Sequence, residues 1–238
     1  MQGPYGFEMN ESCRNCTIRN LGFFCELAEP ALNNLERIGS SSAYPEGAIL
    51  FIEKQNPRGV YLLCQGEVKL SVSSREGKIV IVRIASAGEI LGLQAVLSGT
   101  PYEVTAETLH ACRLVFVYRD EFLRFIANYP ETNQNTIKQL TAQYQSTCEQ
   151  LRTVGLGSSP HEKLAKLLLD WPVHDQPAKD GSRIKMSLTH EELAECIGVT
   201  RETVSRTLSE FRNRHLVSIQ GSTFVIPNRA ALQKCVNL

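Results

Sequence analysis

Residues 188–208, with the sequence LTHEELAECIGVTRETVSRTL, decide the fold of the carboxy-terminal part of the chain. Thr189 with Glu192 matches a capping box, in which the two residues bind each other's backbone, so a helix is expected to begin here. Gly198 supplies a turn, and Thr200 is expected to cap a second helix. Two helices joined by a short glycine-containing turn are typical of a helix-turn-helix.

The second helix of this motif is predicted to have two different faces. Val204, Leu208 and Phe211 form its apolar face. The opposite face, near the amino-terminal end, presents Arg201, Glu202, Ser205 and Arg206. Residues at these positions of a helix-turn-helix reach base edges in the major groove, where Arg binds guanine and Glu accepts from cytosine. The alternative is a solvated, salt-bridged helix face, but a predicted hairpin wing at residues 218–226 favours DNA binding.

Upstream of this motif, the pattern changes to short strands. Between Ala43 and Arg119, apolar runs are separated by turn signals about every ten residues, a spacing typical of an antiparallel roll or sandwich. The expected strands are Ile49–Ile52, Val60–Leu63, Val68–Val72, Ile79–Ile84 and Cys112–Val117.

A long helix is predicted between these two parts, because residues 131–154 contain neither Gly nor Pro. Its less polar residues recur every three or four positions and form one narrow seam, which favours pairing with a second copy over packing on its own domain. The seam consists of Ile137, Leu140, Tyr144, Cys148 and Leu151. Gly155 to Pro160 then break the helix and are read as a hinge. A further amphipathic helix is expected near residues 161–171.

Composition and charge limit the classes of function that this chain can have. The 238 residues carry 25 basic and 25 acidic side chains, yet six basic and only two acidic residues lie from Arg201 onward, so the neutral total hides a basic end. No apolar run approaches the ~18 residues of a membrane helix, and the amino terminus does not resemble a secretory signal. A reducing cytoplasm is therefore expected, where the eight cysteines are thiols, metal ligands or redox centres. No catalytic triad, phosphate loop or HExxH motif indicates an enzyme.

This order of elements resembles the CRP/FNR family of bacterial transcription regulators over nearly the whole chain. Residues 201–206, RETVSR, are similar to that family's recognition helix, in which the Glu and the second Arg read a G·C pair. The resemblance implies an α+β fold with a cysteine-bearing arm (1–42), a cyclic-nucleotide-binding-like β-roll (43–129), a dimerisation helix (130–155) and a winged helix-turn-helix (156–238). It also implies a homodimer on an inverted repeat of double-stranded DNA, with TTGA-like or TGTGA-like half-sites about one turn (~34 Å) apart, and RNA polymerase as a partner.

The signal is not expected to be cAMP. A cyclic-nucleotide pocket of this family needs an acid for the ribose and an Arg-Ser pair for the phosphate. Leu93 stands in place of the acid, and Glu103-Val104 in place of Arg-Ser. An acid placed against a phosphate repels it, so cAMP binding is not expected. The same stretch resembles the FNR branch instead.

The FNR branch holds a [4Fe–4S] cluster on three cysteines from an arm and one from the roll. Cys13, Cys16, Cys25 and Cys112 are in register with that pattern, although the gap from Cys16 to Cys25 is longer than in the best-known members. The resemblance thus implies oxygen or redox sensing through the cluster. The alternatives are zinc on the same cysteines, a thiol switch, or no cofactor and another small ligand. The other cysteines, Cys64, Cys148, Cys196 and Cys235, are read as buried packing residues.

Overall fold

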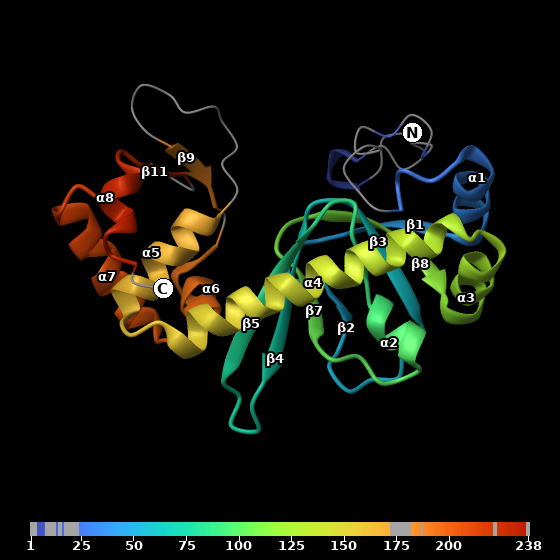
Figure 1. The fold of residues 1–238 in the computed structure, drawn as a ribbon, viewed down its shortest axis with the longest axis horizontal. Coiled ribbons are helices and arrows are strands. Elements are labelled where there is room, and N and C mark those ends of the chain that lie inside the picture. Colours follow the sequence, from blue (N-terminus) through green and yellow to red (C-terminus); the bar gives the residue numbers. More distant parts are fainter. Residues whose placement is uncertain are drawn as a thin grey trace. The chain divides into compact units, whose positions relative to one another are not determined.

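The computed structural model describes residues 4–7, 13, 16, 24–171, 182–186, 188–220 and 223–236 (Figure 1). By its internal contacts the chain divides into two compact units, and each is described by itself. The first comprises residues 1–72 and 82–146, and the second comprises residues 73–81 and 147–238. Within the described ranges, no helix has the length and apolar character needed to cross a membrane.

The first unit contains two four-stranded sheets, which confirm the predicted roll. One sheet has the order β1-β8-β3-β6, from Ser40–Tyr44, Cys112–Tyr118, Gly59–Gln65 and Ile90–Leu91. The other has the order β2-β7-β4-β5, from Ile49–Phe51, Thr105–Thr108, Glu67–Ser73 and Ile79–Ser86. The pairings of β8 with β1 and β3, of β3 with β6, and of β7 with β2 and β4 are antiparallel. The five expected strands appear as β2, β3, β4, β5 and β8, whereas β1, β6 and β7 were not predicted.

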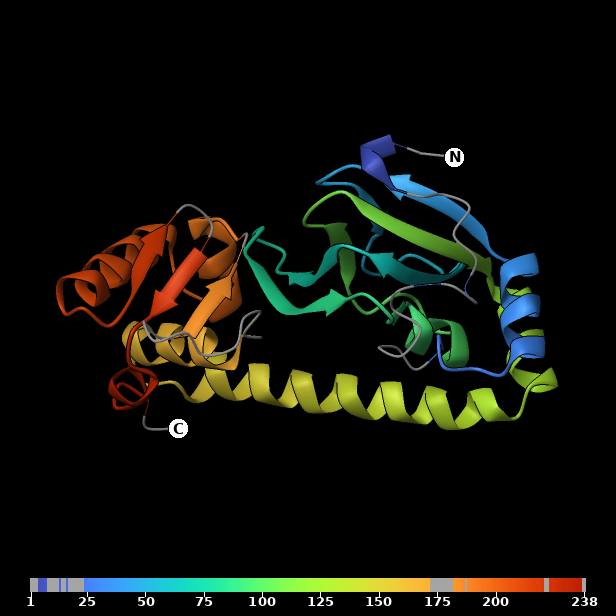
Figure 2. The same ribbon diagram turned by 90° about the horizontal axis from the view of Figure 1, so that it is seen from above.

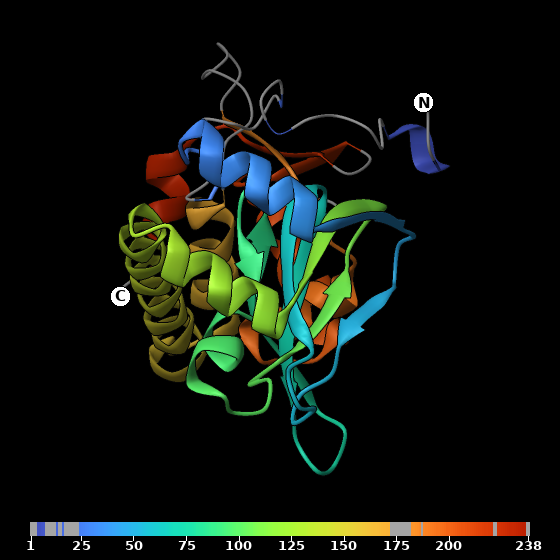
Figure 3. The ribbon, with the colours of Figure 1, turned by 90° about the vertical axis from the view of Figure 1, so that its right-hand side faces the viewer.

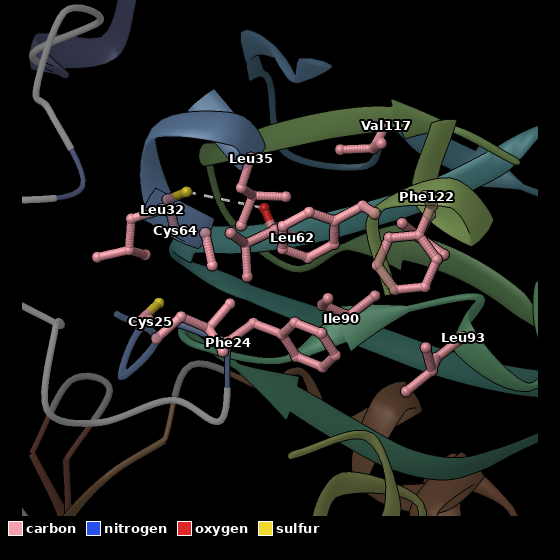
Figure 4. Packing of buried hydrophobic residues seen from close by; sticks show 14 of the residues in the cluster. Phe24, Cys25, Leu32, Leu35, Leu62, Cys64, Ile90, Leu93, Val117 and Phe122 are labelled. Atoms are coloured by element: carbon pink, nitrogen blue, oxygen red, sulfur yellow. Dashed lines mark hydrogen bonds between the residues drawn. The ribbon is translucent and has the colours of Figure 1, made fainter. Parts of the chain in front are cut away.

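The sheet that contains β3 and β8 separates two hydrophobic cores. The inner core lies between the sheets and includes Phe51, Leu63, Tyr102, Cys112 and Leu114. The helix-side core lies on the other face, against α1 (Glu29–Ile38), α2 (Leu93–Ser98) and α3 (Arg119–Asn128). Its members include Phe24, Cys25, Leu32, Leu35, Leu62, Cys64 and Phe122 (Figure 4). Figure 3 shows α1 and α3 side by side over this face, and the two helices are in contact.

The long helix α4 runs without interruption from Glu131 to Leu156 (Figure 2), two residues beyond the predicted end. Gly155 therefore lies inside the helix, and the next helix begins at Pro160. Gln139 is fully buried and binds the backbone of Ile90 in β6 twice: its Nε2 donates to the carbonyl at 2.7 Å, and its Oε1 accepts from the N–H at 3.1 Å. This two-way pairing attaches the first half of α4 to the edge of the sheet.

In its described part, the second unit contains the end of α4, four further helices and a small sheet, as the winged helix-turn-helix prediction requires. The helices are α5 (Pro160–Asp170), α6 (His190–Ile197), α7 (Arg201–Asn213) and α8 (Arg229–Gln233). The strands β10 (Ser218–Gln220), β11 (Thr223–Ile226) and β9 (Ser182–Lys185) form an antiparallel sheet in that order, and β10 with β11 is the expected wing. Buried side chains from these helices and strands form its core: Leu164, Leu168, Ile184, Leu193, Ile197, Val204, Leu208, Phe211 and Phe224.

Replacing Gln139 by Ala is expected to lower the free energy of unfolding by about 2–4 kcal/mol, because a buried N–H and a buried carbonyl of Ile90 each lose a partner. Gln145→Ala on the exposed surface of the same helix is the matched control. Urea denaturation of the full chain measures both variants. Equal stability of the two variants would contradict the role assigned to Gln139.

Candidate nucleic-acid interface and cysteine cluster

The helix-turn-helix is held by the local contacts that the sequence predicted. The side chain of Thr189 accepts from the Glu192 N–H, and the Glu192 carboxylate accepts from the Thr189 N–H, so the capping box at the start of α6 is complete. Gly198 ends α6 with φ of 68°, a left-handed conformation that glycine adopts without steric cost. Thr200 Oγ1 accepts from the Thr203 N–H at 3.3 Å and caps α7.

The recognition helix α7 presents its predicted reading residues to solvent. Val204, Leu208 and Phe211, on the opposite face of α7, are buried, as expected. Arg201, Glu202 and Arg206 are exposed, and no described side chain forms an ion pair with any of the three. These side chains therefore remain available to a ligand.

Glu202 is held in its ionised form. Hydrogen bonds from its own backbone N–H and from the Thr200 hydroxyl lower the pKa of this carboxyl, and the nearby Arg201 charge adds to the effect. A carboxylate accepts hydrogen bonds only, which is the chemistry needed to bind a cytosine amino group in the major groove.

Ser205, the fourth predicted reading residue, is half-buried and already has a partner. Its hydroxyl forms a hydrogen bond of 2.9 Å with Nδ1 of His190, the first residue of α6. This contact joins the two helices of the motif, and no periodic pattern of residues predicts it. Ser205 thus sits at the border of the exposed face.

The predicted seam of α4 divides into exposed and covered positions. Ile137, Tyr144 and Leu151 are 65–72% exposed and follow one another at intervals of seven residues. Leu140 is half-buried and packs against the helix-side core, and Cys148 is half-buried. The buried positions of the first half of α4 are polar, namely Thr132, Thr136 and Gln139. The first half of this helix therefore buries three polar side chains, while three large apolar side chains of the helix are exposed.

The arm cysteines gather on the helix side of the sheet. Cys25 is buried in the helix-side core, and Cys13 packs against that core. Burial, and after it the negative charges of Cys64, Cys13 and Cys16, raise the pKa of Cys25 to about 12. Burial, and after it the charges of Glu36 and Cys16, raise the pKa of Cys13 to about 11. Cys13, Cys25 and Cys64 thus meet at the helix-side core, and Cys16 lies close enough to Cys13 and Cys25 for its charge to raise their pKa values.

Cys112, the predicted fourth ligand, is not brought to this cluster. Its side chain is fully buried in the inner core, where the thiol donates to the carbonyls of Glu67 at 3.3 Å and His110 at 3.2 Å. Burial raises the pKa of Cys112, and the only charge that contributes among the described residues is that of Glu67. In the described part of the chain, no three Cys, His, Asp or Glu side chains are arranged to hold a metal ion as they stand.

The positions compared with a cyclic-nucleotide pocket have other roles here. Leu93 is buried in the helix-side core, and Glu103 is exposed. In the inner core, the rings of Phe51 and Tyr102 stack with centroids 4.0 Å apart, and the Tyr102 hydroxyl donates to the Gly59 carbonyl at 2.7 Å. Leu93 therefore offers no acid to a ribose, and Glu103 offers no cation to a phosphate.

Comparison with known proteins identifies the family. Residues 42–129 match the cyclic nucleotide-binding domain, and residues 162–235 match the Crp-like helix-turn-helix domain. The CRP-like cAMP-activated global transcriptional regulator of Mycobacterium tuberculosis is 25% identical over 192 residues, which cover 80% of this chain and 85% of that protein. The chain belongs to the CRP/FNR family of transcription regulators.

Two further proteins are similar to most of this chain. The transcriptional activatory protein AadR of Rhodopseudomonas palustris is 27% identical over 208 residues, covering 86% of this chain and 84% of that protein. The structure of FixK2 from Bradyrhizobium japonicum superimposes with a TM-score of 0.72 at 19% identity, covering 84% of this chain and 98% of that one, and so shares the fold. As a regulator of this family, the chain is not an enzyme.

Proposed function

We propose that this CRP/FNR-family regulator binds an inverted-repeat DNA site as a homodimer and responds to oxygen or redox state through its cysteine-bearing arm. The observation that carries the DNA-binding part is the exposed face of α7, where Arg201, Glu202 and Arg206 are free of ion pairs with described residues while the helix is buried behind them. RNA polymerase is the further partner that membership of the family implies.

The chemistry of this face supports reading of a G·C pair. The planar guanidinium of Arg206 can bind O6 and N7 of guanine together, and the ionised Glu202 can accept from N4 of the paired cytosine. Arg201, at the first position of α7, lies within reach of the same groove by the geometry of the motif. Two short-range contacts of this kind specify a base pair, whereas a merely basic surface does not.

Dimerisation is supported by the exposed apolar row of α4. Side chains seven residues apart lie in one line along a helix, and a line of this kind pairs with the same line of a second helix in a coiled coil. Ile137, Tyr144 and Leu151 form this row in the present chain and are exposed. Two copies would bury the row and place two recognition helices on one duplex.

The sensory part of the proposal is supported by the cysteine arrangement. Cys25 lies in the helix-side core, Cys13 packs against it, and the charge of Cys16 acts on both, an arrangement that suits the three arm ligands of the FNR branch. When bound, a [4Fe–4S] cluster supplies an oxygen-labile redox centre. Cys112 does not fit as the fourth ligand in this structure, because its thiol is enclosed in the inner core.

Replacing Arg206 by Ala is expected to weaken binding to a specific duplex about 5- to 150-fold, the effect of losing one base contact. Fluorescence anisotropy at fixed salt compares duplexes with inverted TTGA or TGTGA half-sites against a scrambled duplex. Arg124→Ala, which removes an exposed charge from α3, is the control and should bind like the parent chain. A uniform loss on all three duplexes would indicate a phosphate contact and contradict the reading role.

Replacing Tyr144 by Glu is expected to convert the dimer to a monomer, because a charge would be buried in the middle of the apolar row. Sedimentation velocity measures the change, and affinity for the full inverted repeat should fall to that for a single half-site. Ala142→Glu, on an exposed part of α4 outside the row, should leave the dimer intact. A dimeric Tyr144→Glu protein would show that the interface lies elsewhere.

A further inference from the structure

We propose that Cys64, and not Cys112, is the fourth thiol of a metal site formed with Cys13, Cys16 and Cys25. The site is of the four-thiolate class, which takes an iron–sulfur cluster or a zinc ion. This inference rests on the proposed redox-responsive function and names the ligand set of the same site.

The direction of each side chain follows from the strands. Successive residues of a strand point to opposite faces of its sheet. On β8, Cys112 and Leu114 belong to the inner core. On β3, Leu63 belongs to the inner core, whereas Leu62 and Cys64 belong to the helix-side core. Cys64 and Cys112 are therefore on opposite faces of the same sheet.

An irregularity in the β3–β8 ladder sets the position of Cys64. Leu63 pairs with Leu114, but Gln65 pairs with Arg113, so Cys64 is the extra residue of a bulge. Bulges re-aim side chains and interrupt regular pairing. In the helix-side core, Cys64 joins Cys25, and both sulfur atoms are visible in Figure 4.

Cys112 is held in place on its own face. Its thiol makes two hydrogen bonds to carbonyl oxygens of the roll, and its Sγ lies only 2.5 Å from where a side-chain carbon on Gly66 would be. To bind a metal held by the arm, the Cys112 thiol would have to break both bonds and pass to the other face. The next residue, Arg113, is nearly buried and lies close enough to Cys13 for its charge to lower the pKa of that thiol.

Three of the four thiols of the proposed site meet on one face of the sheet, because Cys25 and Cys64 are buried in the helix-side core and Cys13 packs against it. A metal centre bound by these thiols takes the place of their protons. Metal binding and final assembly of a site are coupled in this way, which accounts for thiols that are near one another without a preformed cage. The CxxC spacing of Cys13 and Cys16 suits either a cluster or zinc.

The test is the metal content of the full-length protein, purified without oxygen and also reconstituted with iron and sulfide or with zinc alone. Iron, acid-labile sulfide and zinc per chain are measured for the parent and for Cys64→Ser, Cys112→Ser and Cys235→Ser. Cys235 belongs to the second unit and serves as the control. We expect Cys64→Ser to lose at least nine-tenths of the bound metal, while Cys112→Ser and Cys235→Ser keep the content of the parent.

The Cys112→Ser protein decides the matter even if Cys64→Ser does not fold, with circular dichroism as the check on folding. A folded Cys112→Ser chain without metal would overturn the inference, as would a Cys64→Ser chain with full metal content or a parent chain that binds neither iron nor zinc. Iron with sulfide identifies a cluster, and zinc alone identifies a zinc site. The assay contains no DNA, so a wrong ligand is distinguished from a failure of the DNA-binding proposal, which the Arg206→Ala comparison tests separately.

Discussion

The first unit depends on the alternation of side chains across the sheet that contains β3 and β8. Because successive residues point to opposite faces, one strand supplies both cores: Leu63 enters the inner core, and Leu62 and Cys64 enter the helix-side core. The inner core closes the roll on itself with stacked aromatic rings. The helix-side core joins the sheet to the arm and to α1 and α3. This alternation, together with the bulge at Cys64, places Cys64 on the same face as Cys25 and Cys112 on the opposite face.

The helix α4 connects the proposed sensing and dimerisation functions. Its buried Gln139 pairs with both backbone groups of Ile90, the first residue of β6, so the edge of the sheet and the first half of the helix are fixed together. Leu140, the next residue, packs against the helix-side core that contains Cys25 and Cys64. The exposed row at Ile137, Tyr144 and Leu151 lies on the same helix. A change at the arm thus has a short path of packed residues to the proposed dimer interface.

Local signals made much of the fold predictable from the sequence. The caps at Thr189 and Thr200 and the turn at Gly198 placed α6 and α7, since these contacts span only a few residues. Strands β1 and β7 were missed because their sequences, SSSAY and TAET, are largely polar and gain order from their neighbours. Gln139 was missed because a polar residue is usually exposed, and its partner is 49 positions away. Family register pointed to Cys112, but the face of each cysteine depends on strand alternation and on the bulge at Cys64, which only the ladder reveals.

The central claim is that one face of this sheet carries the sensory thiols, and X-ray diffraction from crystals of the anaerobically purified protein tests it most directly. Anomalous difference maps recorded at the iron and zinc absorption edges locate the bound metal. We predict a metal peak coordinated by the sulfur atoms of Cys13, Cys16, Cys25 and Cys64. The Cys112 thiol should still donate its hydrogen bonds to the Glu67 and His110 carbonyls. A peak bonded by Cys112 would contradict the account.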